Sequence, residues 1–232
     1  LPINKFSYLP SYIPEESNDN RGVITFEEQD NIGHEENPEN DEEQKSLKIN
    51  YYFDNDDTWL AFRYPLSRSG VNLSKKTRME LWLKDFPADK LSIDIELGII
   101  TEDCDGDGLL DQEDGLYVNG INNHLPNGFL DKSPNEDEGI NINGTIYGND
   151  NNILESEDMD GDGQLDAKSF KKDERKYIYQ NIELNADTSI GSNGWIFYNF
   201  NLFDLAKSAF KNQDADSTNI KHIRVIFRKK DN

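Results

Sequence analysis

The chain has 232 residues, with 46 Asp and Glu against 24 Lys and Arg, which gives a formal net charge of −22. A surface this acidic excludes nucleic acid and anionic membranes as partners, because both bind basic surfaces. The single cysteine excludes an internal disulfide framework, and the lack of any run of about 20 apolar residues predicts no direct membrane insertion.

Residues 1–21 are predicted to form an extended N-terminal arm. Pro2 and Pro10 interrupt it, and proline lacks the backbone donor that a strand ladder needs. Two arrangements are open: the arm adds a strand to a neighbouring copy of the chain, or it folds back and covers Trp59 or Trp82 of its own sheet. Because the chain starts with leucine rather than methionine, we expect a processed product or part of a longer protein.

Eight segments with apolar residues at every second position predict β-strands. Strict alternation favours one buried face per strand, as in antiparallel sheets. We therefore predict an all-β fold, a single antiparallel jelly-roll-like β-sandwich over residues 22–232 with a long calcium-binding insertion at 102–172. The predicted strands are residues 22–27, 45–53, 58–64, 78–84, 91–97, 176–184, 194–202 and 220–228.

Residues 103–114 of the insertion match a twelve-residue calcium loop. Carboxylates fall at positions 1, 3, 5, 9 and 12, and position 7 offers its backbone carbonyl, a spacing that gives calcium oxygen ligands at about 2.3–2.6 Å. Gly108 at position 6 allows the sharp turn, and Leu110 at position 8 can tether the loop to the core. The predicted ligands are Asp103, Asp105, Asp107, Leu109, Asp111 and Asp114.

The same pattern returns at residues 158–166, with Gly163 at position 6 and Leu165 at position 8. Position 12 is Ser169, so the last ligand must come from elsewhere. The candidates for it are Glu155, Glu157 and Asp173. A solvated acidic turn is the alternative for each loop, but two copies of so specific a pattern favour calcium. The predicted ligands are Asp158, Asp160, Asp162, Gln164 and Asp166.

Cys104 occupies position 2 of the first loop, where side chains point away from the ion, and we expect a free surface thiol. The insertion is rich in Asn, Asp and Gly, so bound metal is expected to supply the order that an apolar core cannot. Calcium loops of this design would stay half empty in a calcium-poor cytosol. We therefore expect an extracellular or cell-surface location.

Five short stretches flank or enter the insertion: 67–74 (SRSGVNLS), 79–83 (MELWL), 97–103 (LGIITED), 194–195 (GW) and 219–225 (NIKHIRV). Over about residues 22–228, they resemble galactose-binding-like jelly rolls of bacterial surface proteins, which look like carbohydrate-binding modules. Their order is similar to that in sandwich domains of SprA-type outer-membrane proteins. The calcium loops resemble those of dockerins and thrombospondin type 3 repeats. These resemblances imply neither a translocon role nor cohesin binding.

Two non-catalytic functions are compatible with this fold. If apolar side chains face the core, the opposite face gathers aromatic platforms beside polar groups, which suits polysaccharide binding. The alternative for the aromatics is that the insertion or the arm covers Trp59 and Trp82. The second function is a structural or adhesive subunit, in which calcium joins neighbouring copies of the chain. The predicted ligand-binding residues are Tyr52, Trp59, Arg63, Trp82, Asp94 and Glu96.

No pattern in the sequence predicts an enzyme. His34, His124 and His222 are scattered without metal-ligand spacing, and neither a Gly-x-Ser-x-Gly elbow nor a phosphate-binding glycine loop is present. With 46 carboxylates, an acid–base pair can be drawn almost anywhere, so such a pair is not informative.

Overall fold

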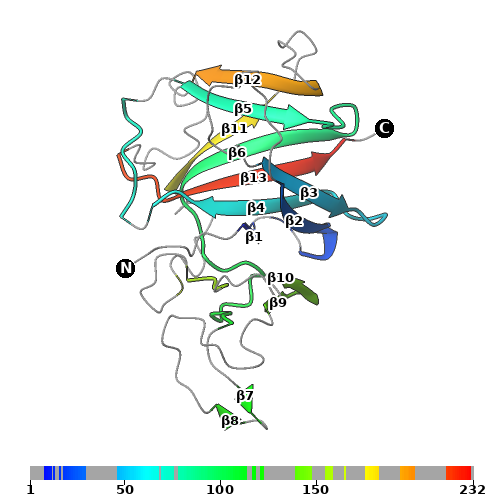
Figure 1. Cartoon of the computed structure of the whole chain (residues 1–232), viewed down its shortest axis with the longest axis vertical. Helices are drawn as coiled ribbons and strands as arrows, with labels where there is room; N and C mark the ends of the chain where they lie inside the picture. The colour runs from blue at the N-terminus through cyan, green and yellow to red at the C-terminus, as the bar shows by residue number, and fades with distance from the viewer. Residues whose placement is uncertain are drawn as a thin grey trace.

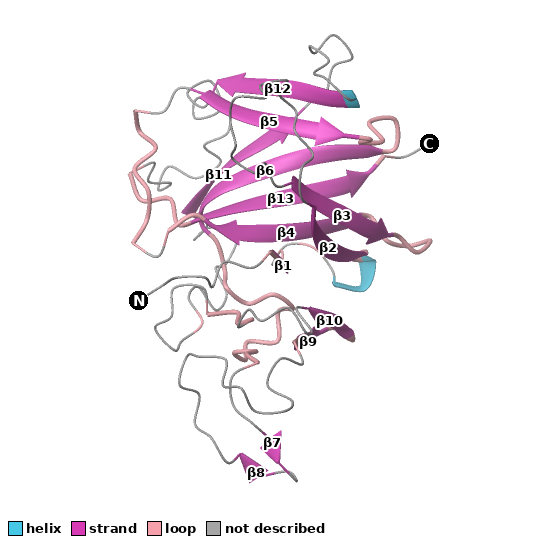
Figure 2. Cartoon of the chain, viewed as in Figure 1, coloured by secondary structure: helices cyan, strands magenta, loops and turns pink. Residues whose placement is uncertain are grey.

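The computed structural model describes residues 8–11, 13, 16, 18–29, 46–67, 69–75, 78–113, 117–118, 121–122, 139–147, 155–158, 165, 176–182, 194–201 and 218–230. Within these ranges the chain forms β-strands and short 3-10 turns, among them Asn18–Asn20, and all paired strands are antiparallel (Figure 2). The prediction of an antiparallel all-β fold is confirmed. The same ranges contain no helix long and apolar enough to cross a membrane.

Each of the eight predicted strand segments matches a strand to within two residues at each end. The strands are β1 (Leu9–Pro10), β2 (Val23–Gln29), β3 (Ser46–Tyr52), β4 (Trp59–Pro65), β5 (Arg78–Lys84), β6 (Leu91–Ile99), β7 (Tyr117–Val118), β8 (Ile121–Asn122), β9 (Ile140–Ile142), β10 (Thr145–Tyr147), β11 (Lys176–Ile182), β12 (Trp195–Asn201) and β13 (His222–Lys229). The five short ones, β1 and β7 to β10, were not predicted.

The centre of the molecule is a five-stranded sheet with the order β1-β4-β13-β6-β11 (Figure 1). Its register aligns apolar side chains in rows across three strands, and we call the side that carries them the apolar face. The rows are Leu60–Phe227–Ile93, Phe62–Val225–Ile95 and Tyr64–Ile223–Leu97. Since alternate residues of a strand point to opposite sides, these rows all lie on one side of the sheet.

Two smaller sheets, β2–β3 and β5–β12, pack on the apolar face. From β2–β3 come Ile24, Phe26, Leu47 and Ile49, and from β5 come Met79, Leu81 and Leu83. These are the alternating apolar residues of each strand, so burial of one face explains why the segments fold as strands. The apolar residues form one continuous core between the large sheet and the two small ones.

The other side of the five-stranded sheet carries charged residues, and we call it the charged face. Arg63, Arg224 and Glu96 form one row across it, and all three are buried. Arg224 forms an ion pair with Glu96. The half-buried Arg228 bonds Asp94 at 2.7 Å and Glu16 at 2.9 Å. The expectation of one buried face per strand is therefore wrong for the central strands, because other segments cover the charged face.

The described part of the arm folds back on its own chain. Strand β1 pairs with β4, and the Tyr8 ring stacks on Tyr64 with a centroid distance of 4.9 Å. Ile13 packs in a buried cluster with Trp59, Ala61 and Ile226 on the charged face. Of the two predicted arrangements, the described arm residues 8–11 and 13 adopt the one in which the arm folds back and covers Trp59.

Candidate metal centre

The first predicted calcium loop leaves the end of β6 and is fixed against the charged face. The backbone N–H of Ile100 donates to Nδ1 of His222 at 3.0 Å, and Nη1 of Arg63 donates to the carbonyl of Thr101 at 2.7 Å. Burial lowers the pKa of His222 to about 3, so its ring is neutral and Nδ1 is free to accept. The sheet therefore sets where the loop begins.

Asp103 at position 1 organises the loop through its carboxylate. The carboxylate accepts hydrogen bonds from the backbone N–H groups of Asp105 at 3.2 Å, of Gly106, and of Gly108 at 3.1 Å. Gly108 has a φ of +77°, which is the turn predicted for position 6. Asp107 accepts in the same way from the N–H of Leu109 at 2.6 Å. Each aspartate thus bends the backbone that follows it.

Three carboxylates converge at this loop. Asp103, Asp105 and Glu157 each place one oxygen within 4.8 Å of the others. Glu157 comes from a distant segment, and its two oxygens accept from the N–H of Cys104 at 2.5 Å and from the N–H of Asp111 at 2.9 Å. The Glu157 N–H in turn donates to the Asp111 carbonyl at 2.9 Å. One glutamate therefore joins both ends of the loop.

The donor set fits a hard divalent cation such as calcium. Ligand oxygens at about 2.3–2.6 Å from an ion lie at most about 5 Å apart, and the three carboxylates meet that limit. All three donors are carboxylate oxygens, which calcium and magnesium prefer to nitrogen or sulfur. Asp103 and Glu157 are also buried, so water does little to offset their charge.

The two nearby guanidinium groups donate to backbone carbonyls of the site rather than to its carboxylates. Arg21 donates to the carbonyl of Cys104 at 2.9 Å, and Arg63 donates to the carbonyls of Thr101 and, at 3.1 Å, of Glu157. Within the described residues, neither arginine forms an ion pair with a carboxylate of the loop. The arginines therefore fix the backbone around the site.

Burial and crowding disfavour the ionised carboxylates when no cation is bound. Burial raises the pKa of Glu157 to about 7. Burial also raises the pKa values of Asp105 and Asp111, and the neighbouring carboxylates add to both effects. A bound cation would favour the ionised forms, because an opposite charge at short range stabilises a carboxylate.

The structure brings together some of the predicted ligands and leaves others apart. Asp103 and Asp105 meet at the site, whereas Asp107 and Leu109 are exposed and Asp111 is half-buried beside it. Of the second loop, Asp158 is half-buried and its N–H bonds the Ser156 hydroxyl at 3.1 Å, while Leu165 is buried. The remaining predicted ligands, Asp114, Asp160, Asp162, Gln164 and Asp166, lie outside the described residues.

Sequence reasoning missed the role of Glu157 in the first loop. Glu157 was predicted as a candidate for the second loop, because it directly precedes Asp158. The structure instead joins it to Asp103 and Asp105. The contact follows from the docking of residues 111–113 on 155–157, where Glu113 also accepts from the Glu155 N–H at 3.0 Å. No spacing in the sequence encodes that pairing, so the sequence carried no signal for it.

The expectation of a surface thiol at Cys104 is wrong. Cys104 is fully buried in a small apolar cluster with Leu9, Ile140, Ile142 and Tyr147, and burial raises its pKa well above the usual range. The isoleucines belong to the β9–β10 hairpin, whose turn residues Asn143 and Gly144 both have positive φ. An Asn-Gly turn of this kind matches the twist of a hairpin. Cys104 and the β9–β10 hairpin therefore share an apolar cluster with Leu9 of the arm.

The six predicted sugar-binding residues do not share one exposed face. Tyr52 is exposed and Trp82 is half-buried, and both lie on the small sheets. The other four are buried on the charged face of the five-stranded sheet: Trp59, Arg63, Asp94 and Glu96. Side chains that point away from the core in two packed layers point in opposite directions, so the six residues fall on opposite sides of the molecule.

No protein-family model matches the chain, and a search of curated proteins finds no match to it.

Proposed function

We propose that this protein is a non-catalytic, calcium-binding β-sandwich module that works at the cell surface or outside the cell. In this proposal the five-stranded sheet and the two small sheets are the layers of a jelly-roll-like sandwich. Residues 102–172 are the insertion, and they hold calcium against the charged face. The convergence of Asp103, Asp105 and Glu157 carries the proposal.

The charge of the whole chain supports a structural role for the cation. A net charge of −22 opposes a compact fold through self-repulsion, and each bound calcium ion removes two units of it. The site also joins segments from different parts of the chain, the loop at 103–111 and Glu157. An ion that binds only when these segments are together stabilises the folded state by mass action.

Isothermal titration calorimetry and thermal unfolding, with calcium or with EGTA, test the proposal. We expect heat from calcium binding and a higher Tm, since ligand at about 100 times its Kd adds about 2.7 kcal/mol. Magnesium is expected to bind more weakly, because it demands a tighter octahedral site. Glu157→Gln should weaken calcium binding at least about tenfold, whereas Glu80→Gln, which removes the same charge from an exposed position on β5, should not. No heat together with a Tm indifferent to EGTA would contradict the proposal.

A further inference from the structure

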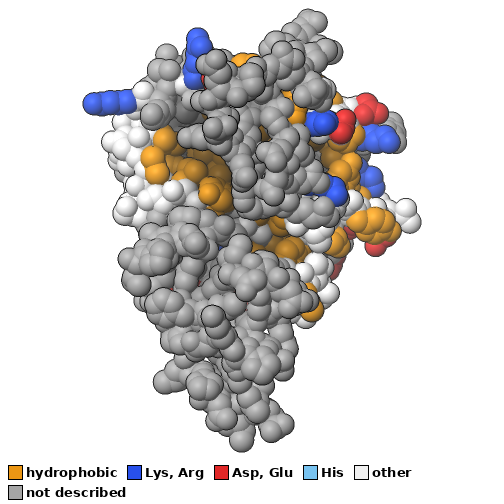
Figure 3. All heavy atoms as spheres, viewed as in Figure 1, with side chains coloured by type: hydrophobic (Ala, Val, Ile, Leu, Met, Phe, Trp, Pro, Cys, Tyr) orange, Lys and Arg blue, Asp and Glu red, His pale blue; other side chains and the backbone are white. Residues whose placement is uncertain are grey.

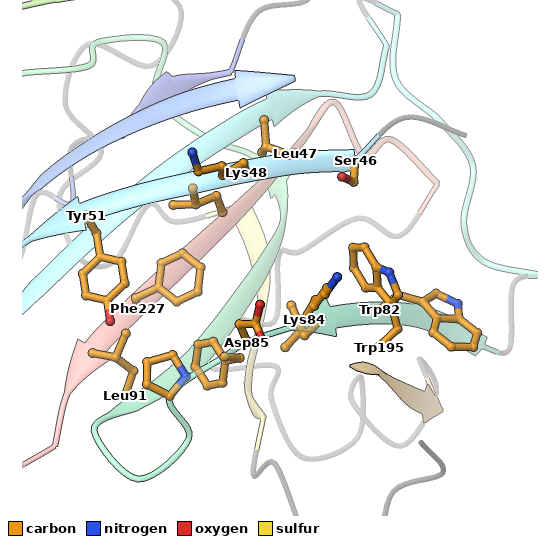
Figure 4. A pocket seen from close by; sticks show the side chains of 14 residues that line it. Ser46, Leu47, Lys48, Tyr51, Trp82, Lys84, Asp85, Leu91, Trp195 and Phe227 are labelled. Atoms are coloured by element: carbon orange, nitrogen blue, oxygen red, sulfur yellow. The ribbon is translucent and has the colours of Figure 1, made fainter. Parts of the chain in front are cut away.

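A pocket lies between the two small sheets, on the side of the molecule away from the candidate metal centre. Its volume is about 380 Å³, and strand β3 borders one side while the end of β5 and the turn after it border the other (Figure 4). Leu91 and Phe227, from the apolar face of the large sheet, lie at its floor. The volume is at the lower end of the range for ligand pockets, roughly 300–1,000 Å³, so it suits one or two rings.

Aromatic side chains form much of the wall. Trp82 and Trp195 lie at one end of the pocket, and Tyr51 and Phe227 lie at the other (Figure 4). Strand pairing opposes Trp82 to Phe197, with ring centroids 4.6 Å apart, and this contact holds the indole in place. Flat rings with a fixed position present a surface for the C–H faces of a sugar ring.

The described charged residues that line the pocket differ in balance from the chain as a whole. Lys48 and Lys84 are basic and Asp85 is acidic among them, whereas the chain has 24 Lys and Arg against 46 Asp and Glu. Lys84 forms no hydrogen bond or ion pair with the described residues. Figure 3 shows hydrophobic, basic and acidic side chains next to one another around the end of β5. An anionic group would therefore find its favourable contact here rather than elsewhere on an acidic surface.

We propose that this pocket binds a sugar ring that carries a carboxylate, of the uronic acid type. The ammonium group of Lys84 pairs with the carboxylate, and the aromatic walls contact the ring. Asp85 and Ser46 bond the hydroxyl groups, since a carboxylate accepts and a serine hydroxyl both donates and accepts. Asp85 favours a sugar over an apolar carboxylate, because a ligand without hydroxyl donors would leave it facing a second negative charge.

The backbone at Asp85 adds a further observation. Asp85 has a φ of +55°, a conformation uncommon for residues other than glycine. Strained residues of this kind gather at binding sites, where the strain fixes the direction of a side chain. Here the strained position directly follows Lys84, so the turn places an acceptor next to the ammonium donor.

The three tryptophans of the chain provide a direct test by NMR of the indole N–H groups in the full-length protein. Trp82 and Trp195 line the pocket, whereas Trp59 is buried in a separate cluster on the charged face and serves as an internal reference. Galacturonic acid and glucuronic acid should shift the signals of the first two and leave the third unchanged. Galactose, glucose and benzoate should bind at least about tenfold more weakly, because each lacks either the carboxylate or the hydroxyls.

Matched variants locate the contact. Lys84→Gln should weaken uronate binding about tenfold or more, whereas Lys75→Gln, which removes the same charge from an exposed turn outside the pocket, should change it less than about twofold. Equal binding of neutral sugars, equal binding of benzoate, or no effect of Lys84→Gln would overturn the proposal.

Titration in EGTA separates this pocket from the cation site, since a carboxylate can also bind calcium. If EGTA abolished the shifts of Trp82 and Trp195 while the protein stayed folded, the uronate would be bound through calcium and the pocket proposal would be wrong.

Discussion

The two faces of the five-stranded sheet differ in the interactions that they make. On the apolar face, three rows of aliphatic and aromatic side chains pack against the small sheets, and this contact depends on area more than on direction. On the charged face, Arg63 and His222 bond particular backbone atoms of the loop after β6. These bonds depend strongly on geometry. The apolar face therefore stabilises the sheet, and the charged face positions the candidate site.

This contrast predicts that the two faces can be separated by mutation. Loss of apolar area should lower the stability of the whole molecule and leave the affinity of the folded site for calcium unchanged. Loss of a directed bond on the charged face should alter that affinity as well.

The largest effect is expected for Ile93→Ala on the apolar face. Ile93 is fully buried in the row with Leu60 and Phe227, so the substitution leaves a cavity that costs about 2–5 kcal/mol. Urea unfolding measures this loss, and calorimetry below the unfolding transition should give an unchanged calcium Kd. A weaker Kd in the folded variant would show that the two faces are coupled and would break the contrast.

A smaller loss of stability, accompanied by weaker calcium binding, is expected for Arg63→Leu. The substitution leaves the Thr101 and Glu157 carbonyls unpaired, but it also removes a buried charge, so the net cost should be about 1–3 kcal/mol. Because Arg63 bonds both sides of the site, the calcium Kd should rise about tenfold. Arg228→Leu is the control: its bonds go to Asp94 and Glu16, so it should lower stability without changing the Kd. Equal effects of both variants on the Kd would mean that Arg63 has no special positioning role.

The strands could be predicted from sequence because each one alternates apolar and polar residues against a single core. The burial of the charged face could not be predicted, because Arg63 and Glu96 have the spacing of solvent-facing residues. Only the fold shows that the loop and the arm bury them. The glycine turn of the predicted calcium loop could be predicted for the same reason as the strands, because it depends on neighbouring residues. The Glu157 contact could not be predicted, because Glu157 accepts from the N–H of Cys104, which lies 53 residues earlier in the chain. Local patterns predict local structure, and this contact is not local.

A third prediction compares two carboxylates within the loop. Asp103 is buried and accepts three backbone hydrogen bonds, whereas Asp107 is exposed. Asp103→Asn should therefore cost about 1–2 kcal/mol without calcium and abolish measurable binding. Asp107→Asn should leave the metal-free stability within about 0.5 kcal/mol and weaken binding only a few-fold. Thermal unfolding in EGTA and calcium calorimetry measure the two quantities. If Asp107→Asn lowered the stability and the calcium affinity more than Asp103→Asn, the cation would not be bound where the three carboxylates converge.

The smallest effect concerns pH, and Glu157 and His222 contribute with opposite signs. In the metal-free protein the pKa of Glu157 is raised to about 7 from 4.5 by burial, so between these values the folded state holds a proton that the unfolded chain has lost. Its contribution to stability therefore falls as the pH rises through that window. The pKa of His222 is lowered to about 3 from 6.5, again by burial. There the unfolded chain holds the extra proton, and the contribution rises with pH from about 3 to 6.5.

Because these contributions oppose each other between about pH 4.5 and 6.5, the difference between wild type and Glu157→Gln isolates the glutamate. In EGTA the variant should gain stability relative to wild type as the pH rises from about 5 to 8, by on the order of 1–2 kcal/mol. In saturating calcium, wild type should instead be more stable than Glu157→Gln above about pH 7, because the ionised carboxylate then binds the cation and the amide binds it more weakly. Urea unfolding at several pH values, with and without calcium, measures both differences. If the stability difference between the two proteins in EGTA stayed constant across this range, Glu157 would already be ionised in the folded metal-free protein. Burial alone would then not make the cation necessary.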